Sequence, residues 1–145
     1  MENTKKKILV VVEDDLDLQN AVLDRFRSER DFQVFKASDG EEAISIILDQ
    51  KPELILLDLL LPKLDGFKVL ERIRNYPDKS VAGSKVVVLS NLWSDKDILH
   101  ARSLNIDEYF VKSNTNLEDV IKKIKQLTRA PEVPRPPAFD KLPRV

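Results

Sequence analysis

Side chains able to hold a cation or a phosphate occur directly after short apolar runs at four places in the chain. In chain order they are Glu13-Asp14-Asp15, Asp58, Ser90 and Lys112. Carboxylates that converge repel one another, and their pKa values rise unless a cation intervenes. A few carboxylate oxygens suit Mg²⁺, which keeps several of its own waters. We therefore expect a magnesium site if Glu13, Asp14 and Asp58 converge.

A lysine and a serine beside such a site would favour phosphoryl chemistry. The metal and the ammonium of Lys112 would neutralise the oxygens of a phosphoryl group on Asp58, and the hydroxyl of Ser90 would donate to one of them. Each residue alone has a plainer role, because acidic residues favour helix N-termini and lone lysines or serines are common in loops. The joint placement of these residues is what indicates a site.

The apolar runs predict the strands that would position these side chains. Residues 8–12, 54–57 and 86–89 are continuously apolar, which is typical of strands buried on both faces. Residues 32–35 and 109–111 are shorter and weaker strand candidates.

Between these runs, apolar residues recur at helical spacing in five segments. The stripes are Leu18-Val22-Phe26, Ala43-Ile44-Ile47, Phe67-Leu70-Ile73, Ile98-Ala101-Leu104 and Leu117-Val120-Ile121-Ile124-Leu127. Three of the helix starts carry Ser or Thr with an acidic residue three positions later, a spacing typical of N-terminal caps. These pairs are Ser38 with Glu41, Ser94 with Asp97 and Thr115 with Glu118.

Five alternating strand–helix units predict an α/β fold built on a doubly wound, five-stranded parallel sheet. Ligands bind such sheets outside the carboxyl ends of the strands. The fold would therefore bring Glu13, Asp14, Asp58, Ser90 and Lys112 to one edge of the molecule.

Composition excludes several other kinds of site. The 145 residues carry 24 basic and 25 acidic side chains, a net charge of -1, which argues against a chain whose main role is to coat nucleic acid. The chain has no cysteine and one histidine, His100, which excludes thiolate and multi-histidine metal sites. Neither G-x-G-x-x-G nor G-x-x-x-x-G-K-[ST] occurs. The apolar run at 8–12 is too short for a membrane span, so we expect a cytoplasmic protein.

Residues 131–145 hold five of the eight prolines and show no apolar period. We expect a domain over 1–129 and a proline-rich tail or linker over 130–145.

In these residues and their order, the chain resembles a known family, the receiver domain of two-component response regulators. The resemblance covers about residues 5–128 and rests on an ordered set of segments. They are Ile8-Leu-Val-Val-Val-Glu-Asp-Asp15, Asp58-Leu-Leu-Leu-Pro-Lys-Leu-Asp-Gly66, Val87-Val-Leu-Ser90 and Asp107-Glu-Tyr-Phe-Val-Lys112. The family implies a flavodoxin-like (βα)₅ fold with strand order 2-1-3-4-5.

The resemblance also implies roles for individual residues. Asp58 would accept the phosphoryl group, and Asp14 would bind Mg²⁺ with help from Glu13, Asp58 and the carbonyl of Leu60. Lys112 and Ser90 would hold the phosphoryl oxygens. Tyr109 would be an aromatic switch that turns inward when Ser90 moves to the phosphate. The register leaves Asp15 ambiguous, although the acidic pair falls best on Glu13 and Asp14.

Three departures from the family pattern have consequences. Ser113 follows Lys112 where the family usually has a cis proline. Because a non-proline cis bond costs about 3 kcal/mol, the sequence leaves the isomer of the Lys112–Ser113 bond open. Asn91 stands where a smaller residue is usual, which would narrow access to Asp58. Leu60 and Leu92 lie where the family controls the approach of water, and apolar groups cannot orient a water, so we expect slow self-dephosphorylation.

The resemblance implies a signalling switch rather than an enzyme, one that catalyses at most its own phosphoryl transfer and dephosphorylation. Its donor would be a histidine kinase or a histidine phosphotransfer protein, and its output a downstream protein effector. It would not bind nucleic acid or membrane directly, and a phosphorylation-dependent homodimer is a family mode that no sequence pattern here fixes. The 145 residues show no effector domain, so the chain would act alone or precede an output module.

Two alternatives remain open. A phosphorylation-independent interaction module is motivated by Ser113 and Asn91. A phosphatase or phosphotransferase is disfavoured because Leu60 stands where a second aspartate would be needed. The sequence identifies neither the cognate kinase nor the stimulus.

Overall fold

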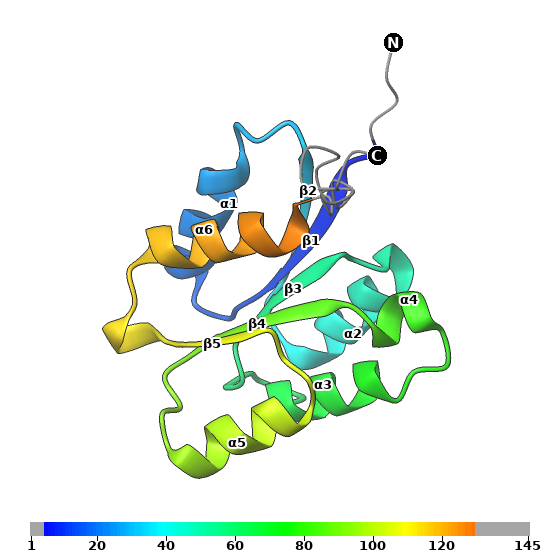
Figure 1. The fold of residues 1–145 in the computed structure, drawn as a ribbon, viewed down its shortest axis with the longest axis vertical. Helices are drawn as coiled ribbons and strands as arrows, with labels where there is room; N and C mark the ends of the chain where they lie inside the picture. The colour runs from blue at the N-terminus through cyan, green and yellow to red at the C-terminus, as the bar shows by residue number, and fades with distance from the viewer. Residues whose placement is uncertain (1–4, 130–145) are drawn as a thin grey trace, which may run out of the picture.

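The computed structural model describes residues 5–129, and Figure 1 shows their arrangement. Five strands form one parallel sheet. They are β1 (Lys7–Val12), β2 (Phe32–Ala37), β3 (Leu54–Leu57), β4 (Lys85–Ser90) and β5 (Glu108–Val111). The strand order is β2-β1-β3-β4-β5, which confirms the predicted doubly wound topology. In the register, Val12 pairs with Leu57, so β1 and β3 end side by side.

Helices cover both faces of this sheet (Figure 1). They are α1 (Leu16–Phe26), α2 (Gly40–Gln50), α3 (Gly66–Arg74), α4 (Lys79–Ala82), α5 (Asp95–Ser103) and α6 (Leu117–Thr128), and a 3₁₀ turn, η1 (Lys112–Asn114), follows β5. One face packs against α1 and α6, and the other against α2, α3 and α5. The central strands are buried on both sides, which is why their sequences are continuously apolar.

The sequence predicts one helix start correctly and misplaces two. Ser94 caps α5 as expected, accepting from the backbone N–H of Asp97 at 3.1 Å. The cap of α2 is Asp39 rather than Ser38, and the cap of α6 is Asn116 rather than Thr115. The hydroxyl of Thr115 donates instead to the carbonyl of Val111, at 2.6 Å. These carboxylate and amide caps satisfy helix N–H groups as a serine or threonine would.

The short helix α4 is not predicted by the sequence pattern, because four residues are too few to show an apolar period. It begins after Asp78, whose side chain accepts from the backbone N–H of Ser80.

Arg74, the last residue of α3, ties together the segments that lead into β4 and β5. Its guanidinium donates to four backbone carbonyls at 2.7 to 2.8 Å, those of Ala82, Ser84, Leu104 and Asn105. One side chain therefore satisfies the polar groups of two loops at the amino ends of the strands.

His100 joins α5 to α3. Its ring stacks on Phe67 with centroids 4.4 Å apart and planes 6° apart, and its Nε2 lies 3.6 Å from Glu71. Among residues 5–129, no helix is long and apolar enough to cross a membrane. The expected proline-rich tail lies outside the described residues.

Candidate phosphoacceptor site

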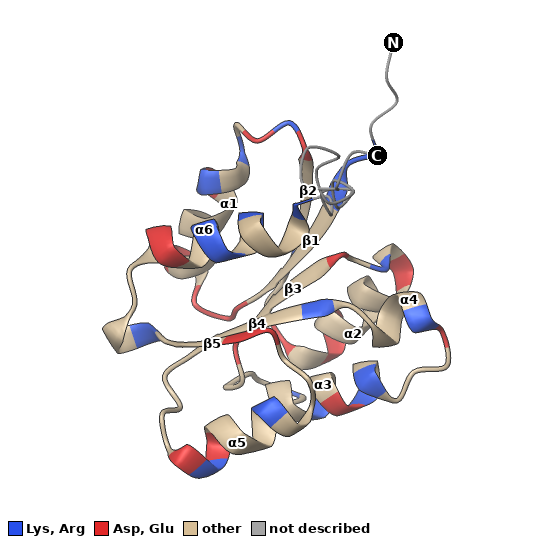
Figure 2. Ribbon diagram, viewed as in Figure 1, with Lys and Arg blue, Asp and Glu red and all other residues tan. Residues whose placement is uncertain are grey.

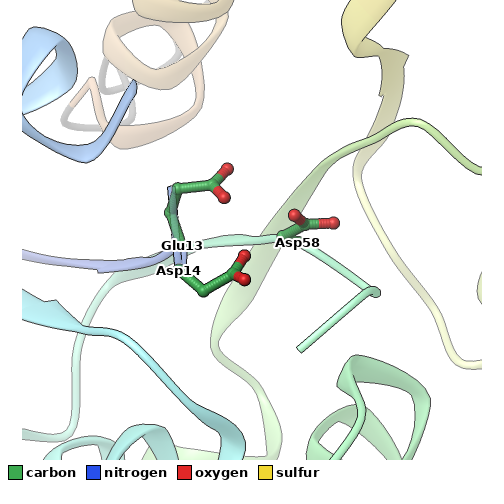
Figure 3. A group of neighbouring side chains, drawn as sticks. All are labelled: Glu13, Asp14 and Asp58. Atoms are coloured by element: carbon green, nitrogen blue, oxygen red, sulfur yellow. The ribbon is translucent and has the colours of Figure 1, made fainter. Parts of the chain in front are cut away.

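Three carboxylates meet where β1 and β3 end. Glu13 and Asp14 follow β1 and Asp58 follows β3, and one oxygen from each lies within 4.8 Å of the others. Figure 3 shows the Glu13 and Asp14 carboxylates on the side of their backbone that faces Asp58. Glu13 and Asp58 are each only 4% exposed, whereas Asp14 is exposed.

Asp15 has a different position. Its carboxylate caps α1, accepting from the backbone N–H of Asp17 at 3.0 Å and of Leu18 at 3.4 Å. The acidic pair in the cluster is therefore Glu13 and Asp14.

The ammonium of Lys112 lies inside this cluster. Its Nζ is 2.7 Å from Oδ2 of Asp58 and 2.8 Å from Oε1 of Glu13. Burial lowers the pKa of Lys112, but its hydrogen bonds to Asp58 and Glu13 outweigh that effect, and the pKa is raised. Lys112 is therefore a fixed positive charge that Asp58 and Glu13 share.

One lysine leaves the cluster with excess negative charge. Burial raises the pKa of Glu13 from 4.5 to about 7, with a further contribution from the charge of Asp58, while hydrogen bonds from Lys112 and from the Asp15 backbone oppose the rise. A buried carboxylate with a raised pKa, such as Glu13, is stabilised in its charged form by a divalent cation nearby. Carboxylate oxygens are the ligand type that Mg²⁺ and Mn²⁺ accept, so the residues present fit such an ion.

The loop after β3 is built to hold Asp58. The backbone N–H of Leu60 donates to Oδ1 of Asp58 at 3.1 Å. A Cβ on Gly66 would lie 2.5 Å from the carbonyl oxygen of Asp58, and one on Gly40 would lie 1.8 Å from the carbonyl oxygen of Leu64. At both positions the neighbouring backbone lies so close that only glycine, which has no Cβ, fits there.

Ser90 and Tyr109 are connected through Leu92 in the loop after β4. Ser90 is fully buried, and its Oγ accepts from the N–H of Leu92 at 3.4 Å. The hydroxyl of Tyr109 donates to the carbonyl of Leu92 at 2.6 Å. Burial, and then the charges of Asp97 and Asp58, raise the pKa of Tyr109 to about 12. The ring is 9% exposed, so it already lies inward in this structure.

The residues that depart from the family pattern lie near this site, at least partly exposed and joined by trans peptide bonds. Residues 5–129 contain no cis peptide bond, so the Lys112–Ser113 bond is trans. Asn91 is exposed in the loop after β4, and Leu92 beside it is half-buried. Leu60 is 51% exposed at the mouth of the site.

Gln19 supports the site, although the sequence pattern alone does not single it out. It is 1% exposed, and its side-chain amide donates to the carbonyls of Glu13 and Ala37 at 2.9 and 3.3 Å. A signal is present, since Gln19 lies on the buried face of α1 with Val22 and Phe26. A polar residue on such a face needs a partner.

Comparison with known proteins identifies the family. Residues 9–125 match the family described as response regulator receiver domain. The probable transcriptional regulator ycf27 of Cyanophora paradoxa is 35% identical over 133 residues, which cover 90% of this chain and 53% of the relative. The gliding motility regulatory protein of Myxococcus xanthus is 32% identical over 123 residues, covering 85% and 16%. This chain spans about half, or less, of the length of these relatives.

Solved structures of response regulators have the same fold as this chain. The phosphorylated cyanobacterial phytochrome response regulator RcpA superposes with a TM-score of 0.75 at 32% identity, covering 87% of this chain and 97% of that one. The Mn²⁺-bound form of the response regulator Rcp1 gives a TM-score of 0.70 at 31% identity, covering 83% and 91%. The match over residues 9–125, together with this fold, shows that the chain belongs to the response regulator receiver domains of two-component signalling.

Proposed function

We propose that the protein is a phosphorylation-activated switch whose phosphoacceptor is Asp58. The observation that carries the proposal is the position of Asp58, buried, 2.7 Å from Lys112 and beside two further carboxylates. The donor would be a histidine kinase or a histidine phosphotransfer protein. The phosphorylated state of RcpA, at 32% identity, supports the same chemistry here.

In the proposed step, an Oδ of Asp58 attacks the phosphorus of a phosphohistidine or an acyl phosphate. The new O–P bond forms as the bond to the donor breaks, and the electron pair of that bond stays on the donor. Lys112 remains protonated and neutralises charge on the transferred oxygens. The Ser90 hydroxyl would donate to one of these oxygens after leaving its contact with Leu92.

The side chains of Glu13, Asp14 and Asp58 and the carbonyl of Leu60 would hold Mg²⁺. When bound, this ion supplies positive charge that offsets the carboxylates and the incoming phosphoryl group. The Mn²⁺-bound form of Rcp1 supports a divalent cation in this cluster.

Phosphorylation would be read out through Ser90, Leu92 and Tyr109. Movement of Ser90 toward the phosphoryl group would change the loop that Tyr109 holds, and with it the surface around α5 and β5. The proposed reader is a protein effector or a second copy of this domain in the cytoplasm. The domain itself would comprise residues 1–129, with 130–145 as a tail or linker.

Intact mass spectrometry tests the proposal. The protein is incubated with a small acyl phosphate, with and without Mg²⁺, beside Asp58→Asn and the control Asp49→Asn, at an exposed carboxylate of α2. We expect one added phosphoryl group in the wild type and the control, and none in Asp58→Asn or without Mg²⁺. No uptake, combined with no Mg²⁺ binding in a titration, would contradict the proposal and favour a phosphorylation-independent interaction module.

A further inference from the structure

A groove lies at the end of the sheet opposite Asp58. It has a volume of about 790 Å³ and is lined by residues at the amino ends of β1, β3 and β4, such as Ile8, Glu53 and Lys85. The short helix α4 forms another part of its wall, through Lys79. Because Asp58 follows the carboxyl end of β3, this groove is separate from the phosphoacceptor site.

The groove is strongly basic. Among residues 5–129, its charged lining consists of one acidic residue, Glu53, and the five basic residues Lys5, Lys51, Lys79, Lys85 and Arg129. The carboxylate of Glu53 accepts from the backbone N–H of Ile8. Figure 2 shows basic segments at the first residues of β1, on α4 and near the end of α6, while the chain as a whole has a net charge of -1. The positive charge is therefore concentrated locally.

Helix ends account for some of this charge. Lys51 caps α2 and pairs with Asp78 at 2.9 Å, and the ammonium of Lys85 donates to the carbonyl of Leu127 in the last turn of α6. Cations at helix carboxyl ends offset the helix dipole. Lys5 and Lys79 have no such partner, since neither forms an ion pair with any residue of 5–129. Within this part of the chain, no carboxylate lies at ion-pair distance from these two lysines, and both line the groove.

We propose that this groove binds a small molecule that carries several phosphate groups and has the size of a nucleotide. Its volume falls within the roughly 300–1,000 Å³ typical of small-molecule sites. Lysine ammonium groups bind phosphate as point charges. The groove also has an apolar part of its wall, formed by Ile8, Pro52 and Leu127, against which an organic group could pack. The proposal does not depend on phosphorylation of Asp58.

Isothermal titration calorimetry on the full chain tests this, with ATP and tripolyphosphate as probes. Titrations without Mg²⁺ and with a chelator keep the probes from bridging to the acidic cluster through a metal. We expect saturable binding that Lys5→Glu and Lys79→Glu each weaken by about tenfold or more, because each reverses a charge at the ligand. Lys36→Glu, at an exposed lysine of β2 outside the groove, should leave the affinity unchanged.

Two further titrations distinguish a phosphate site in this groove from binding at Asp58 and from general attraction to acidic ligands. Asp58→Asn should bind both probes like the wild type, so a failure of the phosphoacceptor proposal would leave this result intact. Absence of saturable binding, or binding that ignores both Lys5→Glu and Lys79→Glu, would overturn the proposal. Equal binding of hexaglutamate would also overturn it, because the groove would then select acidic peptides rather than phosphates. Thermal melts of each variant verify that the protein is folded.

Discussion

The raised pKa of Glu13 makes a quantitative prediction about stability. In the metal-free protein its carboxyl titrates at about 7, against 4.5 for an ordinary glutamate, because the group is buried beside Asp58. At a pH between these two pKa values, the carboxyl is charged in the unfolded chain and takes up a proton when the chain folds. The folded state therefore loses stability as the pH rises through this window.

The size of the effect follows from the difference in pKa. Each pKa unit corresponds to about 1.4 kcal/mol. Complete ionisation of Glu13 therefore lowers the free energy of unfolding by about 3 kcal/mol, relative to a pH at which the carboxyl is protonated in both states. Most of this falls between about pH 5 and pH 8. Lys112 stays protonated throughout, because its own pKa is raised. Glu13→Gln removes the titration while keeping the size of the side chain.

The assay is urea denaturation at several pH values with a chelator present. The difference in unfolding free energy, Glu13→Gln minus wild type, should grow by about 2 to 3 kcal/mol from about pH 5 to about pH 8. Glu42→Gln, at an exposed glutamate of α2, should show no such growth. If the Glu13→Gln and wild-type profiles run parallel, burial beside Asp58 does not raise the pKa of Glu13 and this reasoning is wrong.

Three further predictions concern Leu60 in the loop after β3, Arg74 at the end of α3, and Gly40 at the start of α2. Leu60→Asn should shorten the lifetime of the phosphorylated protein, measured by loss of added mass over time, because an exposed amide at the site mouth can orient a water and Leu60 cannot. Arg74→Leu should lower the free energy of unfolding by about 3 to 5 kcal/mol, since four backbone carbonyls lose their charged donor; Arg72→Leu, at an exposed position of α3, should cost far less, and similar losses for both would contradict this role. Gly40→Ala should slow phosphorylation and lower the melting temperature, because its Cβ would lie 1.8 Å from a loop carbonyl, whereas Gly83→Ala meets its nearest atom at 3.0 Å and should be milder.

The sheet could be predicted from sequence because parallel strands are buried on both faces. Residues 8–12, 54–57 and 86–89 therefore stand out as unbroken apolar runs, and the structure extends two of them by a residue or two. Helix starts are harder to predict from sequence, because Ser38 and Asp39 are adjacent and both residue types cap helices, and the structure shows that Asp39 caps α2. Helix α4 is too short to produce any periodic signal.

The site could be predicted only to the level of which strand ends would meet. The topology places Glu13, Asp58 and Lys112 at one edge, but it does not predict that one ammonium pairs with both carboxylates. That pairing depends on side-chain geometry between residues that are 54 positions apart or more. The contact of Tyr109 with the carbonyl of Leu92 is of the same kind.

The bonds made by Arg74 have a mechanical consequence for the sheet. The same guanidinium holds the carbonyls that lead into β4 and those that lead into β5, so the two strands share one fixed base. Their opposite ends carry Ser90 and lead to Lys112. The pairing of β4 with β5 continues from this base to the last pair, Ser90 with Val111. The two strands are therefore joined along their length, and they hold Ser90 and Lys112 beside Asp58 as one unit.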